Sequence, residues 1–355
     1  MALLEVEDLH VSFNTADGVV KAVRGLTFSV DKGQTVGIVG ESGSGKSVST
    51  QTIMGLTAGA RVSGQARFEG RDLLTMDDRE LRAVRGAKVG MIFQDPLSSL
   101  HPYYKVGWQI VEMIRAHADV SKAQAKNRAI DLLRLVGIPK PEARVDEYPH
   151  QFSGGMRQRA MIAMAMALNP ILLIADEPTT ALDVTVQAQV LDVMERLQTE
   201  FGTAIVMITH DMGVIADIAD DVVVMYAGTA MEKAERRELF YHNHHPYTEG
   251  LLASIPQPGA DRTKRLLPIH GTPPSLIQLP TGCPFNPRCP YAFDKCRTET
   301  PPLAGVHGRS DHLSACWLPS DEAQRQTERE RVQAVLARQT EINEEAARNL
   351  AEVSS

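Results

Sequence analysis

The sequence lacks a long uninterrupted apolar run. Its most apolar stretch, MIAMAMALNPILLIAD, is broken by Asn169 and Pro170. It falls short of the roughly 20 apolar residues that a transmembrane helix needs. The first residues, MALLEVEDLH, are acidic where a signal peptide would carry positive charge. We therefore expect the chain to stay in the cytosol and not to insert in a membrane.

An excess of positive charge is also missing. The formal net charge is −7 and the pI is about 5.9, whereas a nucleic-acid-binding surface needs a basic face. We therefore expect no nucleic-acid partner. The apolar share of 43% is ordinary for a soluble globular protein. A chain of 355 residues is long enough for one large domain with a smaller appendage.

Cysteine is absent from most of the chain. The sequence has four cysteines, and none precedes Cys283. Cys289 and Cys296 follow closely in CPFNPRCPYAFDKC, and Cys316 completes the set. In a reducing compartment, clustered cysteines favour metal ligation over disulfides.

Short segments with strand patterns recur through the first 230 residues. Residues 3–13 alternate apolar and polar side chains, and with a polar turn at 15–18 and a second strand at 22–30 they predict a hairpin. Continuous apolar runs are typical of strands buried on both faces. Such runs lie at 35–40, 88–93, 171–176, 204–209 and 221–228.

Three later segments differ from this pattern. Between about 96 and 168 apolar residues recur every three or four positions, which predicts a helical subdomain inserted in the sheet domain. After about 245 proline becomes frequent, which suits extended, irregular chain. The tail, 321–355, is rich in Glu, Arg, Gln and Ala and predicts either a solvated helix or a frayed segment.

The segment GESGSGKS (40–47) matches the P-loop pattern G-x-x-x-x-G-K-S. Its glycines let the backbone curl so that successive N–H groups point at a phosphate. The N-terminus of the following helix adds about half a positive charge. In such a loop we expect Lys46 to reach the β- and γ-phosphates and the Ser47 hydroxyl to ligate Mg²⁺.

The segment ILLIADE (171–177) is an apolar strand that ends in two carboxylates. Asp176 can hold the Mg²⁺ shell, and Glu177 can polarise the attacking water as a general base. A strand that ends in acidic residues is common by itself. Together with the P-loop it predicts the second half of a nucleotide site.

Four further motifs resemble those of ABC-transporter ATPases. FSGGMRQR (152–159) resembles the signature sequence, and TTALD (179–183) resembles the D-loop. Gln94 in FQDP is similar to the Q-loop residue, and His210 in ITHD is similar to the switch histidine. Order and spacing match across about residues 3–250. The resemblance implies an α/β fold, a P-loop NTPase cassette over 1–250 with a RecA-like core, an antiparallel β subdomain and the inserted helical subdomain.

The resemblance also implies roles for particular residues. His210 is expected to contact the γ-phosphate and to hold Glu177 and water in line. Gln94 is expected to sense Mg²⁺ and water, and Phe13 is the best candidate for stacking on adenine. The implied ATP-binding residues are Phe13, Gly40, Ser42, Gly43, Ser44, Gly45, Lys46, Ser47, Val48, Gln94 and Asp176. The implied Mg²⁺ ligands are Ser47, Gln94 and Asp176, and the implied catalytic residues are Glu177 and His210.

The signature motif implies a cassette dimer. In the family two cassettes pack head to tail, and the signature helix of one closes on the γ-phosphate held by the other. The motif departs from the common LSGGQ form, with Phe152 and Met156 in place of Leu and Gln. The serine and both glycines remain at the expected helix N-terminus, an anion-binding position. The implied dimer residues are Ser153, Gly154, Gly155, Met156 and Asp183.

The C-terminal part resembles the extension of peptide-permease ATPases, a subfamily that includes oligopeptide, dipeptide and nickel importers. The resemblance rests on HHPYTEGLLASIP, on HGTPPSL and on the cysteine window, and it covers about residues 251–320 as a small irregular extension. The spacing C-x5-C-x6-C-x19-C lacks paired C-x2-C knuckles. Four thiolates suit a 4Fe–4S cluster or Zn²⁺. The subfamily includes members with a cluster at such cysteines, which favours the cluster over zinc and over free or oxidised thiols. The neighbouring His242, His244 and His245 indicate a loop rather than metal ligands.

The resemblance implies one ATPase subunit of a bacterial importer of di- or oligopeptides, with ATP, Mg²⁺ and a 4Fe–4S cluster. The implied partners are a second ATPase subunit, favoured to be a different chain, two transmembrane permeases and an extracytoplasmic binding protein. The implied location is peripheral, on the cytoplasmic face of the membrane. Two alternatives stay open: a soluble ABC ATPase outside transport, and a redox sensor whose cluster governs the ATPase. Nickel or another small solute also stays open as the transported substrate.

Overall fold

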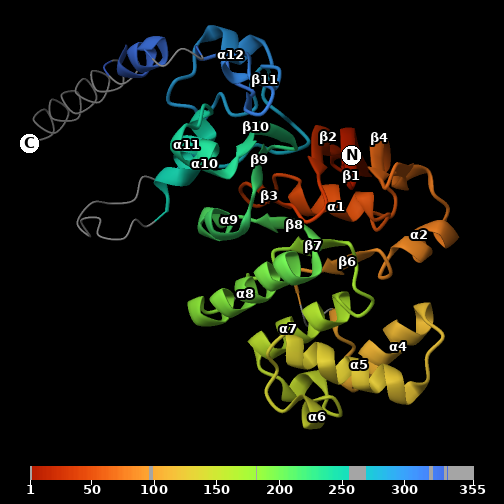
Figure 1. Ribbon diagram of the computed structural model, residues 1–355. Helices are drawn as coiled ribbons and strands as arrows, with labels where there is room; N and C mark the ends of the chain where they lie inside the picture. Colours follow the sequence, from red (N-terminus) through yellow and green to blue (C-terminus); the bar gives the residue numbers. More distant parts are fainter. Residues whose placement is uncertain are drawn as a thin grey trace, which may run out of the picture. The chain divides into compact units, whose positions relative to one another are not determined.

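The computed structural model describes residues 2–95, 99–180, 182–255, 269–319, 323–331 and 334. The chain divides into two compact units, Met1–Ala230 and Met231–Ser355. Figure 1 colours the chain from red at its N-terminus to blue near its C-terminus. No helix in the described part of the chain is long and apolar enough to cross a membrane.

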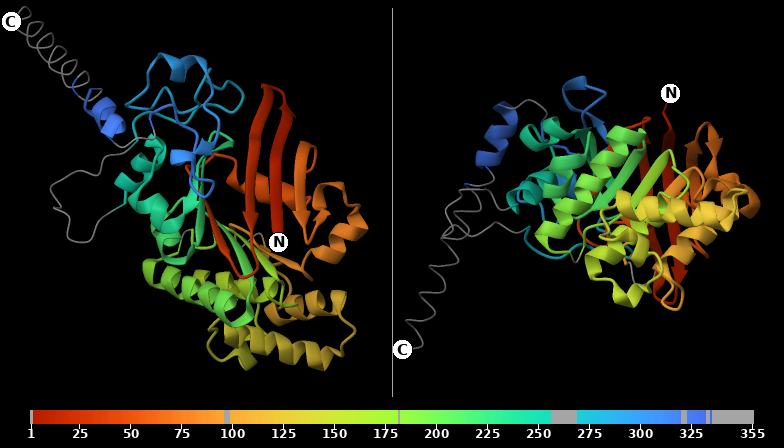
Figure 2. Two further views of the ribbon diagram at one scale, coloured as in Figure 1. Left: turned by 45° about the horizontal axis from the view of Figure 1, so that its top comes forward. Right: turned by 60° about the horizontal axis from the view of Figure 1, so that its bottom comes forward.

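An antiparallel sheet opens the first unit. Its strand order is β2-β1-β4-β5, and Figure 2 shows β1 and β2 as the long red strands. The strands are β1 (Leu4–Thr15), β2 (Gly18–Val30), β4 (Arg61–Phe68) and β5 (Arg71–Asp72). Leu4, Val6 and Leu9 of β1 are buried while Glu5 and Glu7 are not, as expected for a strand with one covered face. The predicted hairpin is confirmed by the antiparallel pairing of β1 with β2.

A parallel sheet forms the core of the first unit, with neighbouring strands in the order β6-β7-β8-β3-β9. Its strands are β3 (Thr35–Val39), β6 (Val89–Ile92), β7 (Leu172–Asp176), β8 (Ala204–Thr209) and β9 (Asp221–Tyr226). Every residue of β3, β7 and β8 is buried. The continuous apolar runs in the sequence therefore identify strands covered on both faces, as predicted.

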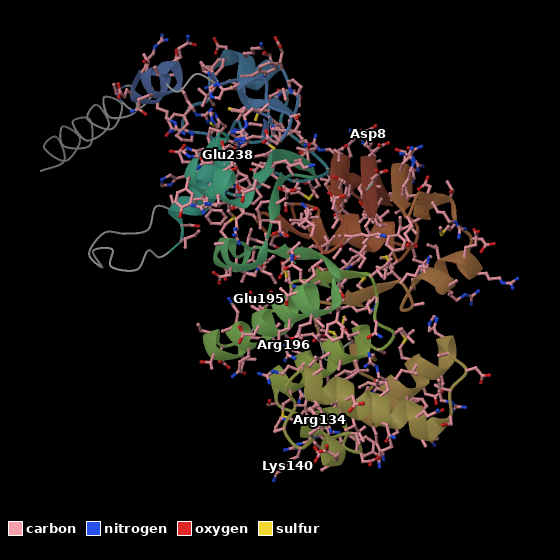
Figure 3. The ribbon with its side chains drawn as sticks, in the orientation of Figure 1. Asp8, Arg134, Lys140, Glu195, Arg196 and Glu238 are labelled. Carbon is pink, nitrogen blue, oxygen red and sulfur yellow. The ribbon has the colours of Figure 1, made fainter. Side chains whose placement is uncertain are left out.

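Helices of two groups complete the first unit. One group contains α1 (Lys46–Ile53), α2 (Asp78–Val84), α8 (Val184–Phe201), α9 (Met212–Ile218) and the 3₁₀ turn η1 (Leu73–Thr75). The α8 helix buries Val190, Met194 and Leu197, whereas Glu195 and Arg196, labelled in Figure 3, are exposed. The α4, α5 and α7 helices contact one another. The second group contains α4 (Val106–His117), α5 (Lys122–Leu135), α6 (Pro141–Arg144), η2 (Pro149–Gln151) and α7 (Gly154–Ala165).

The second unit has little regular structure. β10 (Thr229–Glu235) leads into it, and β12 (Leu313–Ser314) pairs antiparallel with β10 and with β11 (Ala304–Gly305). The other elements are α10 (Arg236–Tyr241), α11 (Pro246–Ala253), α12 (Asp294–Thr298), η3 (Val306–Gly308) and a C-terminal helix at 323–331. The predicted tail is helical at 323–331, and one of its residues, Arg325, is only 1% exposed. Of that predicted tail, residues 321–322, 332–333 and 335–355 lie outside the described part.

Candidate functional site

A glycine-rich turn joins β3 to α1. Gly40, Gly43 and Gly45 have φ values of 151°, 79° and 96°, in the region that favours glycine. A Cβ at Gly40 would lie 2.1 Å from the carbonyl oxygen of Met225, whereas at Gly43 nothing lies within 4 Å. The Ser44 hydroxyl is buried and has no hydrogen-bond partner among the described residues. Open space beside an unpartnered hydroxyl and a helix N-terminus fits a phosphate group.

Lys46 is the first residue of α1 and is 4% exposed. Its ammonium donates to the carbonyl oxygens of Gly40 at 2.7 Å and Glu41 at 3.0 Å. Burial lowers the pKa of Lys46, and the nearby carboxylates of Glu177 and Asp176 oppose that shift. The positive charge therefore lies directly over the turn, where an anion would enter.

Ser47 and Asp176 are in direct contact. The Ser47 hydroxyl donates to Asp176 Oδ1 at 2.7 Å, and Gln51 Nε2 lies 3.4 Å from Oδ2. Asp176 ends β7 and is 1% exposed; burial raises its pKa, while these two hydrogen bonds lower it. A hydroxyl beside a carboxylate supplies the oxygen ligands that Mg²⁺ prefers.

Glu177 follows β7 directly and gathers three side chains. Its Oε2 accepts from Gln94 Nε2 at 3.0 Å and from Thr180 Oγ1 at 2.8 Å, and its Oε1 lies 3.4 Å from His210 Nδ1. Gln94 follows β6 and His210 follows β8, the two strands that pair with β7. Parallel neighbours end at the same edge, so residues far apart in sequence meet there. The structure thus brings together the predicted Gln94, Glu177 and His210.

The backbone of Glu177 is unusual. Its φ is 49° and the side chain is 9% exposed. Left-handed backbone at a non-glycine residue costs on the order of 1 kcal/mol and commonly occurs at functional sites. The turn that follows brings the Thr180 hydroxyl back to the carboxylate. Sequence reasoning assigned Thr180 only to the D-loop motif and missed this contact, because nothing in the letters indicates the left-handed turn.

The signature motif begins a helix of 12 residues, as predicted. Ser153 is the N-cap of α7, and its hydroxyl accepts from the Met156 N–H at 3.3 Å. A Cβ at Gly155 would lie 2.6 Å from Val186 of α8, whereas nothing lies within 4 Å of one at Gly154. Within the described residues, the recorded hydrogen bonds of Ser153 stay inside its own helix. The N-terminus of α7 is therefore capped by Ser153. Its contact with a nucleotide in a neighbouring cassette stays a prediction.

Asp183 and Phe13 have defined places in the fold, and their roles at a nucleotide or at a dimer interface stay predictions. Asp183 is the N-cap of α8, where its side chain accepts from the Val186 N–H at 3.0 Å. Such a cap stabilises a helix by about 1 kcal/mol. Phe13 lies in β1 opposite Val20 and is half-buried. Stacking of Phe13 on adenine stays a prediction.

The four cysteines of the second unit line one narrow cavity of about 20 Å³, together with aromatic side chains that include Tyr291 and Trp317. We call Cys283, Cys289, Cys296 and Cys316 the thiol site. None of the four forms a disulfide within the described part of the chain. Burial raises the pKa of Cys283 to about 11. Burial is also the main cause of the raised pKa of Cys289 and of Cys316.

Backbone amides point at three of these sulfurs. The Leu318 N–H donates to Cys316 Sγ at 3.5 Å. The Cys283 sulfur likewise accepts from the Phe285 N–H, and the Cys289 sulfur from the Tyr291 N–H. In each case the donor lies two residues after the cysteine. Amide hydrogen bonds to sulfur stabilise thiolates and tune iron–sulfur clusters.

The thiol site has soft donors but, within the described part of the chain, no preformed metal geometry. No group of three or more His, Cys, Asp or Glu among the described residues is arranged so that it could hold a metal ion as it stands. The donors themselves fit, because soft thiols line one cavity and receive amide hydrogen bonds. Metal binding would have to deprotonate the thiols and draw them together. The nature of the group at the thiol site therefore stays a prediction.

The histidine loop between α10 and α11 is packed inside the second unit. The backbone N–H groups of His244 and His245 both donate to the carboxylate of Glu232, which is fully buried. His312 Nε2 lies 2.8 Å from the same carboxylate. Burial is the main cause that lowers the pKa of His244 to about 4 and that of His245 to about 3. His244 and His245 are therefore neutral near pH 7.

Comparison with known proteins agrees with this geometry. A family model described as ABC transporter matches residues 23–180, and one described as oligopeptide/dipeptide transporter, C-terminal region, matches residues 231–296. The dimeric cassette MJ0796 bound to ADP and Pi superposes with a TM-score of 0.61 at 25% identity, covering 66% of this chain and 99% of that one. The cassette cbiO1 of Clostridium perfringens, part of the transporter complex cbiONQ, gives a TM-score of 0.58 at 27% identity, covering 68% and 91%.

Curated relatives match nearly the whole chain. The oligopeptide transport ATP-binding protein OppD of Salmonella typhimurium is 51% identical over 321 residues, covering 90% of this chain and 95% of that protein. OppD of Bacillus subtilis is 52% identical over 324 residues, covering 90% of each. The dipeptide transport ATP-binding protein DppD of Escherichia coli is 48% identical over 330 residues, covering 92% of this chain and 100% of that protein.

Fold and site together define the class: a P-loop ATPase built as an ABC-transporter cassette. Within that class, the chain belongs to the family of ATP-binding subunits of oligopeptide and dipeptide ABC transporters. The predicted family and the predicted cassette fold are both confirmed.

Proposed function

We propose that this chain hydrolyses ATP to drive import of di- or oligopeptides. The observation that carries the proposal is the hydrogen-bonded setting of Glu177, whose carboxylate contacts Gln94, Thr180 and His210 one residue after the Asp176–Ser47 pair. Membership of the oligopeptide and dipeptide family supports peptides as the cargo.

The residues divide the work in this proposal. Lys46 and the N–H groups of the glycine-rich turn bind the β- and γ-phosphates, and Ser47 and Asp176 hold Mg²⁺. The metal neutralises charge on the phosphates when bound. Glu177 accepts the proton of the attacking water, and His210 orients the carboxylate and the γ-phosphate. Gln94 donates a hydrogen bond to Glu177 Oε2, so protonation of Glu177 would change this contact.

Pairing with a second cassette completes the site. A nucleotide on Lys46 is bound from one side by its own chain, and the Ser153 end of α7 in a neighbouring cassette covers it from the other. The dimeric form of MJ0796 supports such an arrangement. We favour a different ATPase chain as the partner, with two permease subunits and a binding protein in the complex. The chain then sits peripherally on the cytoplasmic face of the membrane.

The test uses the assembled transporter and peptide-stimulated ATP turnover. Lys46→Ala removes a buried ammonium and should weaken ATP binding roughly 100-fold, with loss of peptide uptake. The matched control is Lys32→Ala, an exposed lysine in the turn before β3, which should leave both unchanged. Unaltered ATP affinity in the Lys46 variant would refute the phosphate site. Nickel uptake without peptide uptake would refute the proposal that peptides are the transported substrate.

We also propose that the thiol site holds a 4Fe–4S cluster with a structural role. The shared cavity and the amide hydrogen bonds to sulfur support a bound soft-metal centre, and the second unit has little regular structure to hold itself together. Protein purified without oxygen should carry iron and acid-labile sulfide. Zinc in their place would point to a zinc staple, and neither metal would refute a metal centre. Equal ATPase rates with the cluster oxidised and reduced would exclude redox sensing.

A further inference from the structure

Arg325 is the one buried residue of the described C-terminal helix. The helix covers 323–331, and its other described residues are exposed or half-buried. Arg325 is 1% exposed and ranks first among the largest fully buried side chains. The described part of this helix has no buried apolar side chain. The contacts of Arg325, the ion pair of Arg329 with Glu249 and the position of Arg329 over the Tyr291 ring contribute to its attachment within the second unit.

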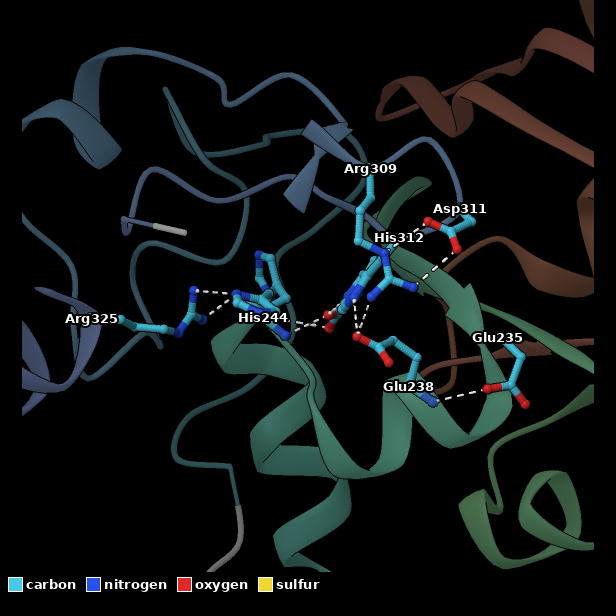
Figure 4. Close-up of polar contacts among 9 residues, drawn as sticks. Glu235, Glu238, His244, Arg309, Asp311, His312 and Arg325 are labelled. Atoms are coloured by element: carbon cyan, nitrogen blue, oxygen red, sulfur yellow. Dashed lines mark hydrogen bonds and ion pairs between the residues drawn. The ribbon is translucent and has the colours of Figure 1, made fainter. Parts of the chain in front are cut away.

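The hydrogen-bond partners of Arg325 are neutral. Figure 4 shows its guanidinium directed at His244. Nη2 donates to the His244 carbonyl oxygen, and Nη1 lies 3.4 Å from His244 Nδ1. Nε is buried and has no hydrogen-bond partner in the described part of the chain. Arg325 forms no ion pair with a carboxylate among the described residues, and the nearby Glu232 is occupied by two backbone N–H groups and His312.

Burial of a guanidinium that forms no ion pair is costly. Glu232 and Glu249 supply some negative charge near Arg325, and a further negative group there would stabilise it. Burial lowers the pKa of Arg325, and Cys316, ahead of Glu232 and Glu249, opposes that shift. Cys316 and Arg325 line the same cavity of about 150 Å³, together with Ser314, whose buried hydroxyl also lacks a partner among the described residues.

Cys316 also belongs to the thiol site, so it lies on both cavities. Four thiolates around either a 4Fe–4S core or Zn²⁺ leave the centre net negative. Such a centre would add a counter-charge to the cavity that Cys316 and Arg325 share. We propose that Arg325 neutralises the loaded thiol site and that loading of this site holds the C-terminal helix against the second unit. The proposal rests on the metal centre proposed above.

The first test compares variants of the full chain purified without oxygen. Arg325→Met keeps the length of the side chain and removes its charge, and Arg331→Met is the matched control on the same helix, since the Arg331 side chain is 76% exposed. Iron release to a chelator should be on the order of tenfold faster in the Arg325 variant than in wild type. Its midpoint potential should be more negative, because a lost positive charge favours the oxidised centre. The control should match wild type, and Arg325→Lys should restore much of the retention.

The second test needs no variant. Hydrogen exchange of the segment 323–331 is compared in the loaded wild-type chain and after chelation. Exchange should rise on removal of the metal while β3 and β8 stay protected. Equal exchange in both states overturns the link between the thiol site and the helix.

The outcomes separate the two proposals. Protein that carries neither iron nor zinc as purified refutes the metal centre itself. Protein that carries the metal, yet releases it at the same rate and shows the same potential in Arg325→Met, refutes only the role of Arg325.

Discussion

The Thr180 hydroxyl donates a 2.8 Å hydrogen bond to Glu177 Oε2. Gln94 Nε2 donates to the same oxygen at 3.0 Å, so Oε1 remains directed at His210. Because both donors bind Oε2, Oε1 can accept a proton from the attacking water. Thr180 therefore positions the base through this hydrogen bond.

Removal of that hydroxyl should slow hydrolysis. Thr180→Val keeps the shape and loses one hydrogen bond, worth about 1–1.5 kcal/mol, so turnover should fall by roughly tenfold with ATP affinity unchanged. Steady-state ATPase of the assembled transporter gives the measurement. Thr180→Ser restores the hydroxyl and should recover most of the rate. A Ser variant as slow as the Val variant would show that the methyl packing matters, not the hydrogen bond.

Glu177→Gln should have a larger effect than the threonine change. The amide cannot accept the proton of water, and loss of a general base commonly costs 10²- to 10⁴-fold in rate, so turnover should fall at least about 100-fold. ATP binding should persist, because Lys46 and Asp176 are untouched. Glu195→Gln, an exposed position on α8, serves as the control. Turnover near wild type in the Glu177 variant would exclude this residue as the base.

A substitution at Gly40 tests whether the glycine-rich turn needs the close backbone approach at this position. Gly40→Ala places a Cβ 2.1 Å from the Met225 carbonyl oxygen at a φ of 151°. Gly59 has a φ of 74° with nothing within 4 Å, so Gly59→Ala carries backbone strain alone, about 1 kcal/mol. The Gly40 variant should lose more stability in urea unfolding and also lose ATP binding. Equal losses of stability in the two variants would contradict this expectation. They would mean that the backbone near Gly40 shifts enough to remove the clash with the Met225 carbonyl oxygen.

The second unit should be sensitive to acid. Burial, and then the charge of Arg325, lower the pKa of His244 from 6.5 to about 4. Between these values the unfolded chain binds a proton that the folded chain does not. Stability from His244 is therefore complete above pH 6.5 and declines as the pH falls towards 4, by on the order of 3 kcal/mol.

Urea unfolding of the metal-free chain measures this dependence. A Trp108→Phe background leaves Trp317 as the single tryptophan, inside the second unit. His244→Asn cannot take up a proton and should reduce the dependence between pH 6.5 and 4 by roughly half, because the pKa of His245 is also lowered, to about 3. The same slope with and without His244 would assign the acid sensitivity to other groups.

Much of the first unit follows from local sequence. The runs at β3, β7 and β8 indicate strands covered on both faces, because apart from the terminal Asp176 every residue in them is apolar, glycine or threonine, and all are buried. The glycine-rich turn follows from its motif, and its φ values explain the glycines. The meeting of Gln94, Glu177 and His210 followed from family resemblance, since only the strand order brings them to one edge.

Other features could not be predicted from local patterns. β4 carries five exposed residues in a row and a central glycine, so it lacks the alternation that identifies a strand. The Thr180 contact depends on the left-handed backbone of Glu177. Arg325 lies in a polar segment typical of a solvated helix, and its burial results from tertiary contacts with His244.

Dependence of ATP turnover on pairing tests the central claim most directly. The isolated chain is diluted until sedimentation shows only monomers, and turnover per chain is compared with that in the assembled transporter. If the Ser153 end of a second cassette must cover the nucleotide on Lys46, turnover per chain should fall towards zero as the pairs dissociate, with ATP still bound. Monomers that hydrolyse ATP at the rate of the assembled complex would contradict the account.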